Sequence, residues 1–165
     1  MKVKICGITN HEDAQKAVYY GAHAVGFIFH KKSPRYVSPS KIRKVIESLP
    51  PFIVPVGVFA DLNEQAVRDI CHFTRIKTVQ FHGDEKPVYC KRFSDFKIIK
   101  AFRVHDLFDF TTVEKYKVDA YLFDTFEGMP PPSDVARIKK IEMVDQNIFA
   151  RTFHVHSTIK TDSYT

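Results

Sequence analysis

Three side chains that can transfer protons lie at the ends of predicted strands in this sequence. Cys6 ends the apolar stretch VKIC, His82 ends KTVQFH, and Asp124 ends AYLFD. If the strands are parallel, their carboxyl ends share one edge of the sheet, and these distant residues converge there. A thiolate can remove a proton or attack a carbonyl, and a carboxylic acid facing it can return a proton. The pair Cys6 and Asp124 therefore predicts proton transfer at a carbon next to a carbonyl or an imine.

Each of the three residues also has a purely structural interpretation. A single cysteine at the end of a buried strand is commonly a small apolar filler. Asp124, which precedes Thr125, could cap a loop, and His82, which precedes Gly83, could bond to the backbone of a turn. The pattern of residues alone leaves these alternatives open.

A basic loop, HKKSPRY, follows the second predicted strand and contains Lys31, Lys32 and Arg35. Such a cluster is usually a solvated loop. At the carboxyl end of a strand, however, a guanidinium group can hold an anionic substrate through paired hydrogen bonds. We therefore expect Arg35 to act on a substrate more than on folding.

Apolar strands alternate with amphipathic helices along the chain. The predicted strands are residues 3–6, 24–29, 53–59, 77–82, 97–102 and 120–124, and helices are predicted over 9–21, 38–49, 61–73, 86–93 and 106–117. Strand centres recur every 20 to 30 residues or so, roughly the length of one βα unit. Six such units form either an open doubly wound sheet or part of an eight-stranded barrel. The first turn, CGITN, lacks the glycine-rich fingerprint of dinucleotide-binding sheets, which favours the barrel.

Length and composition predict one globular domain. The chain has 165 residues, of which 44% are hydrophobic, enough for a packed core. It has no apolar run near the roughly 20 residues needed to cross a bilayer. The cysteines at positions 6, 71 and 90 form no close pair and no zinc-like spacing, which predicts free thiols in a reducing compartment, the cytoplasm. Cys71 and Cys90 fall within helical patterns and are expected to pack in the core.

The formal net charge of +6 suits three kinds of partner: nucleic acid, an anionic membrane, or a phosphorylated small molecule. Nucleic acid is the weakest of these hypotheses, because the basic residues are scattered and the aromatic residues fall in apolar strands rather than between basic ones. Charge alone does not choose among the three.

Several blocks of the sequence carry a family resemblance. KICGIT, AVGFIFHKKSPRYVSP, PVGVF, VQFHGDE, IIKAF and LFDT, in this order and spacing, resemble the phosphoribosylanthranilate isomerase family of tryptophan biosynthesis. The resemblance covers about residues 1–128. It implies a (βα)8 TIM barrel that carries out an Amadori rearrangement, turning the aminoaldose phosphoribosylanthranilate into an aminoketose, carboxyphenylamino-deoxyribulose phosphate. It also implies that no metal or organic cofactor is needed.

The resemblance assigns roles to four residues. Asp124, in LFDT, is similar to the general acid that helps to open the furanose ring and form the imine. Cys6, in KICGIT, is similar to the general base that takes the C2 proton. By the same resemblance, Arg35 in SPRY holds the anthranilate end of the substrate and His82 in QFHG lines the pocket.

Residues 129–165 depart from the family pattern. They contain no FDW-containing stretch, no glycine pair for a seventh strand, and no GVE-type turn after an eighth. Because loops after strands seven and eight of such barrels usually bind phosphate, we expect this site to be lost. The chain resembles a barrel truncated after about six βα units, with a divergent tail that forms a helix over 133–144 and is then strand-like or disordered. The HVH stretch in that tail lacks a third metal ligand.

Two functions remain open at this point. The first is an isomerase of aminoaldose phosphates, and the family resemblance favours it. The second is an inactive barrel fragment, or a non-catalytic assembly partner, that keeps the acid and the base but cannot hold phosphate. In either case, open barrel edges would favour self-association.

Overall fold

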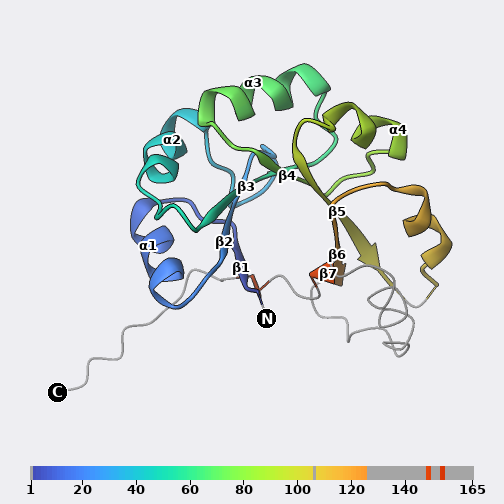
Figure 1. The fold of residues 1–165 in the computed structure, drawn as a ribbon, viewed down its shortest axis with the longest axis horizontal. Coiled ribbons are helices and arrows are strands. Elements are labelled where there is room, and N and C mark those ends of the chain that lie inside the picture. The colour runs from blue at the N-terminus through green and yellow to red at the C-terminus, as the bar shows by residue number, and fades with distance from the viewer. Residues whose placement is uncertain (1, 106, 126–147, 150–152, 155–165) are drawn as a thin grey trace.

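A computed structural model describes residues 2–105, 107–125, 148–149 and 153–154. Six parallel strands form its curved sheet: β1 (Lys4–Cys6), β2 (Ala24–Ile28), β3 (Val54–Phe59), β4 (Thr78–Phe81), β5 (Lys97–Val104) and β6 (Ala120–Thr125). Two short strands extend the sheet, because β7 (Ile148–Phe149) pairs with β6 and β8 (Phe153–His154) pairs with β1, both in parallel. The spatial order is β7-β6-β5-β4-β3-β2-β1-β8. The six main strands therefore follow one another in the order of the chain and curl into part of a barrel (Figure 1).

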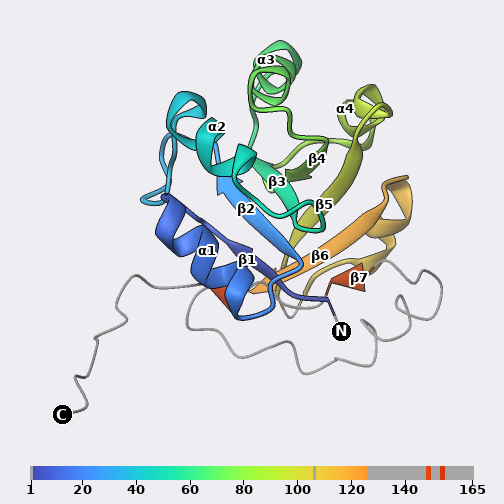
Figure 2. The same cartoon turned by 60° about the vertical axis from the view of Figure 1, so that its left-hand side comes forward.

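Helices connect these strands and lie along the outside of the curve, as Figures 1 and 2 show. They are α1 (His11–Tyr19), α2 (Pro39–Glu47), α3 (Glu64–Thr74) and α4 (Pro87–Cys90), with the 3-10 helices η1 (Lys91–Phe93) and η2 (Phe110–Lys115). Side chains cap the first three, because Asn10, Ser38 and Asn63 each accept a hydrogen bond from a first-turn backbone N–H. This βα alternation confirms the predicted barrel-family fold.

Two predicted helices differ from the observed ones. The helix predicted from residue 61 begins at Glu64, because Asn63 caps it and Asp61 adopts a left-handed backbone with φ of 52°. The helix predicted over 106–117 was wrong in type and length: only η2 forms there, and the Asp109 side chain caps it through the backbone N–H of Thr111. The short helix predicted over 86–93 is present as α4 followed by η1.

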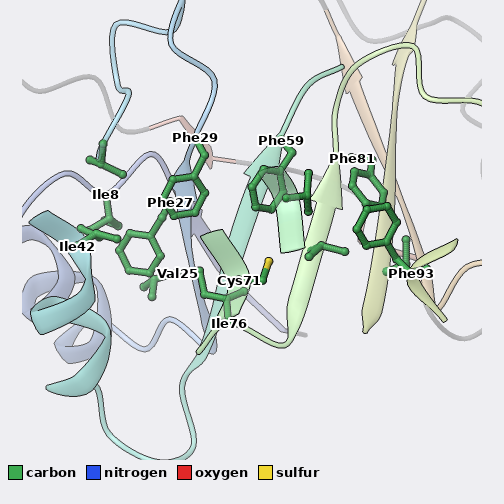
Figure 3. Packing of buried hydrophobic residues seen from close by; sticks show 14 of the residues in the cluster. Ile8, Val25, Phe27, Phe29, Ile42, Phe59, Cys71, Ile76, Phe81 and Phe93 are labelled. Carbon is green, nitrogen blue, oxygen red and sulfur yellow. The ribbon is translucent and has the colours of Figure 1, made fainter. Parts of the chain in front are cut away.

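The core has two layers because successive strand residues point to opposite faces of the sheet. The outer layer lies between sheet and helices and contains phenylalanines from neighbouring strands (Figure 3), among them Phe27, Phe59 and Phe81. The inner layer is smaller and lies on the concave face; it comprises Val56, Ile99, Ala101, Ala120 and Leu122, together with a second cluster of Cys6, Ile28 and Val58.

Cys71 and Cys90 belong to the outer layer, as predicted from their helical patterns. Burial raises the pKa of the Cys71 thiol to about 12 and that of the Cys90 thiol to about 11. Both side chains are therefore packed as neutral thiols at ordinary pH.

The predicted helix 133–144 lies outside the described residues, as does the tail 129–165 apart from β7 and β8. At the described edges, β1 pairs over two residues with β8, and β6 over two residues with β7. The expectation that open edges favour self-association stays a prediction. No helix among the described elements has the length and apolar character needed to span a bilayer.

Candidate active site

The carboxyl ends of the parallel strands bring together the residues that the sequence singled out. Cys6 is the last residue of β1, His82 directly follows β4, and Asp124 is the last residue but one of β6. Phe123 packs in the outer core layer, so the adjacent Asp124 points to the concave face, where Cys6 also lies. The acid and the thiol therefore share one face and one end of the sheet.

A cleft of about 360 Å³ opens at this end of the sheet, and its lining includes His30, Asp61, His82, Gly83 and Arg103. Its walls come from the loops after β2, β3 and β4 and from the end of β5. Histidine and arginine side chains give the cleft groups that can bind an anion. A separate apolar cavity of about 400 Å³ lies at the opposite, amino-terminal end of the strands, away from the acid and the thiol.

His82 contacts Asp124 across the concave face. Its Nε2 lies 3.3 Å from Oδ2 of the carboxylate, and both side chains are about four-fifths buried. On the other side of the ring, the Gln80 amide nitrogen lies 3.0 Å from Nδ1. In the tautomer that accepts this hydrogen bond at Nδ1, the ring proton is on Nε2, toward Asp124. His82 is thus more than a turn residue, since it orients the predicted acid.

Cys6 lies in a space that Gly26 leaves open. The thiol side chain is 5% exposed and packs with Ile28 and Val58. Cys6 pairs with Gly26 in the sheet, and a Cβ at Gly26 would stand only 2.9 Å from the sulfur. A larger residue on β2 would therefore displace the thiol.

Arg35 is half-buried and bonded to the same strand end. Its Nη1 donates a hydrogen bond of 3.0 Å to the carbonyl oxygen of Cys6. The side chain crosses Gly7, whose φ is +88° and where a Cβ would meet Nη1 at 2.6 Å. Gly7 is thus required both by its backbone angle and by the close approach of the guanidinium. The contact gives Arg35 a structural role that the loop sequence did not indicate.

A buried ion pair, which sequence reasoning missed, fixes the loop after His82. Lys100 and Glu85 are 2% and 5% exposed, and Nζ lies 2.9 Å from Oε2. Nζ also donates to the carbonyl of Gly83 at 2.7 Å, while the carboxylate accepts from the backbone N–H groups of Gly83 and Asp61 at 3.0 and 2.9 Å. The signal in the sequence was a lysine inside the apolar strand KIIKAF, near the acid of HGDE.

Within the part of the chain that the structure describes, no cluster of three or more histidine, cysteine or acidic side chains is placed to hold a metal ion. The chemistry that the described residues themselves offer is proton transfer, by a thiol and a histidine-bound carboxyl group.

Comparison with known families gives a match over residues 3–150 to the family described as N-(5'phosphoribosyl)anthranilate (PRA) isomerase. This match continues 22 residues beyond the stretch that carries the motif resemblance. A curated relative from Geobacter sulfurreducens, named N-(5'-phosphoribosyl)anthranilate isomerase, is 44% identical over 126 residues, which is 76% of this chain and 62% of the relative. The chain spans about three fifths of the length of the curated relatives it matches.

Solved structures show the same likeness. Phosphoribosyl anthranilate isomerase from Thermotoga maritima superposes with a TM-score of 0.80 at 31% identity, covering 94% of this chain and 78% of that one. A second structure of such an isomerase, in complex with reduced 1-(o-carboxyphenylamino)-1-deoxyribulose 5-phosphate, gives 0.73 at 29% identity, covering 96% and 90%.

Proposed function

This chain belongs to the N-(5'-phosphoribosyl)anthranilate isomerase family, and we propose that it catalyses the Amadori rearrangement of phosphoribosylanthranilate in tryptophan biosynthesis. The observation that carries the proposal is the placement of a buried thiol, Cys6, and a histidine-bound carboxyl group, Asp124, on one face at one end of the sheet. The free thiols and a biosynthetic role fit a cytoplasmic enzyme.

In the first step Asp124 is the general acid. Its carboxylic acid gives a proton to the furanose ring oxygen, and the bond from that oxygen to C1 breaks. The lone pair of the anthranilate nitrogen forms a C1=N double bond as this happens, which yields an open-chain iminium ion. The contact with His82 Nε2 at 3.3 Å holds the carboxyl group in place for this transfer.

In the second step Cys6 is the general base. Its thiolate takes the proton from C2 and becomes a thiol, while the electrons of the C2–H bond form a C1=C2 double bond and those of the C=N bond return to nitrogen. The enaminol that results then gains a proton at C1 and loses one from the C2 hydroxyl, which gives the aminoketose. C2 is oxidised as C1 is reduced, so the rearrangement needs no external electron carrier.

Arg35 is proposed to bind the anthranilate carboxylate. Its guanidinium lies beside the carbonyl of Cys6, so a carboxylate held there is next to the base. One of its N–H groups is already used by that carbonyl, and the planar group has others to offer to a carboxylate.

The test is loss of anthranilate fluorescence when purified protein is mixed with phosphoribosylanthranilate. We expect turnover that depends on Cys6, with Cys6→Ala and buffer alone as matched controls. A non-catalytic fragment predicts equal rates in all three samples, and that result would overturn the proposal. Carboxyphenylamino-deoxyribulose phosphate should be identified by mass as the product.

A further inference from the structure

The strand that carries Cys6 also carries a buried lysine that the proposed reaction does not use. Lys4 is 6% exposed, and its Nζ has no hydrogen-bond partner within the described residues. Removing an ammonium group from water without a partner costs several kcal/mol. Lys4 therefore needs a compensating group of opposite charge.

The position of the Lys4 amine identifies a candidate for that group. Lys4 and Cys6 are two residues apart on β1 and so lie on the same face of the sheet. The Lys4 Nζ stands 3.1 Å, and the Cys6 sulfur 2.9 Å, from the single point where a Cβ at Gly26 would be. The two atoms are therefore within about 6 Å of each other, a distance at which opposite charges interact strongly in a buried site.

The neighbouring strands offer few other charges at this point. The concave-facing residues of β2 and β3 are apolar or glycine, namely Ala24, Gly26, Ile28, Val56 and Val58. On β4 and β6 the titratable groups of this face are His82 and Asp124, which contact each other. On β5 they are Arg103, an exposed cation in the lining of the cleft, and Lys97, which lines the amino-terminal cavity together with Lys4 and is paired there with Asp119. On the other side of β1, strand β8 pairs with it in parallel, and the backbone of His154 stands opposite that of Cys6.

We infer that Lys4 is a positioning residue for Cys6: its ammonium group, held in the space left by Gly26, stabilises the Cys6 thiolate. The thiolate in turn is the counter-charge that the buried amine lacks. Lys4 keeps its own protons throughout, and the proton taken from C2 resides on sulfur. As a statement about catalysis this inference rests on the proposed function, whereas the pairing of amine and thiolate can be measured without it.

The experiment compares the alkylation of Cys6 by iodoacetamide, followed by mass spectrometry, in wild-type protein and Lys4→Met at pH 7. Methionine is an unbranched side chain one atom shorter than lysine, and it carries no charge. Lys2→Met is the matched control, because Lys2 is exposed and on the same segment. We expect the rate to fall at least tenfold in Lys4→Met, on the order expected from losing a nearby positive charge, and to be unchanged in Lys2→Met.

Cys71 and Cys90 report on the fold in the same samples. Both are buried, and burial holds their pKa values at about 12 and about 11, so they react slowly while the protein is folded. An unchanged or faster Cys6 rate in Lys4→Met, with Cys71 and Cys90 still protected, would overturn the inference.

A second measurement needs no Lys4 variant and covers the case in which Lys4→Met fails to fold. Thiolates absorb at about 240 nm whereas thiols do not, so wild-type protein at pH 7 should show an absorbance that Cys6→Ser lacks. Absence of this difference would also overturn the inference. If the thiolate is present but phosphoribosylanthranilate is not converted, the pairing stands and the proposed function fails.

Discussion

The carboxylate of Asp124 on β6 lies 3.3 Å from Nε2 of His82, which follows β4, although β5 separates the two strands in the sheet. The contact spans the concave face at the carboxyl end of the strands. It joins two residues 42 positions apart, in the motifs VQFHGDE and LFDT. The two motifs are therefore parts of one site.

The first prediction concerns Asp124, the proposed acid, and Cys6, the proposed base. Asp124→Asn and Cys6→Ala should each lower turnover by about 100-fold or more, because each removes a group that we propose to move a proton. His82→Asn should have a smaller effect, since it leaves the acid in place but removes the contact that orients it. Steady-state rates with phosphoribosylanthranilate measure all three. Near-normal turnover in Asp124→Asn or Cys6→Ala would remove that residue from the mechanism.

The second prediction concerns Arg35. From the sequence alone, Arg35→Ala would change the free energy of unfolding by no more than about 0.5 kcal/mol, as surface changes usually do. The hydrogen bond to the Cys6 carbonyl raises the expected loss to about 1 kcal/mol. Urea unfolding measures this loss of unfolding free energy, and the Michaelis constant for the substrate measures the proposed binding role. An unchanged Michaelis constant would leave Arg35 with a structural role alone.

The third prediction concerns the buried pair of Lys100 and Glu85. Lys100→Met leaves a buried carboxylate without its cation and should cost about 3–5 kcal/mol in unfolding free energy. Lys97→Met is the matched control on the same strand, because Lys97 is paired with Asp119 at 2.7 Å but is three-quarters exposed, and its loss should cost less than about 1 kcal/mol. Equal losses in the two variants would show that the buried pair does not hold the loop after His82.

Much of this site could be predicted because local sequence determines where strands end. The positions of Cys6, His82 and Asp124 at strand ends could be predicted because each residue ends a short apolar stretch. In parallel βα units these strand ends lie at one edge of the sheet. The role of Gly26 could not be predicted, since it depends on the register that sets Gly26 opposite Cys6. The partners of Lys100 and Arg35 depend in the same way on contacts between segments far apart in the chain. The error at residues 106–117 was local: the Asp109 cap begins a short 3-10 helix.

The fourth prediction is a loss of stability above pH 9 due to Cys71. Burial raises its pKa from 9.0 to about 12, so between these values the unfolded chain ionises while the folded protein stays neutral. The contribution is fully present below pH 9 and is lost as pH rises toward 12, at about 1.4 kcal/mol per pH unit. Urea midpoints at pH 7 and pH 10 should therefore differ more in wild-type protein than in Cys71→Ser. Cys90 lowers stability at high pH in the same way, because its pKa is raised to about 11. If the stability of wild-type protein and of Cys71→Ser fell by the same amount between pH 7 and pH 10, Cys71 would not be the cause.

The fifth prediction concerns how the substrate phosphate is held. Residues 129–165 contain no glycine, so they do not supply the glycine-pair loop that usually binds phosphate in such barrels. For a protein made of residues 1–165 alone we therefore expect slow turnover with a high Michaelis constant, because binding energy from a remote phosphate is what aligns the reacting carbon. The reduced product analogue and its dephosphorylated form should inhibit within about threefold of each other, since an unheld phosphate adds little to binding. Inhibition that is tenfold or more stronger with the phosphate present would show that residues of this chain bind it.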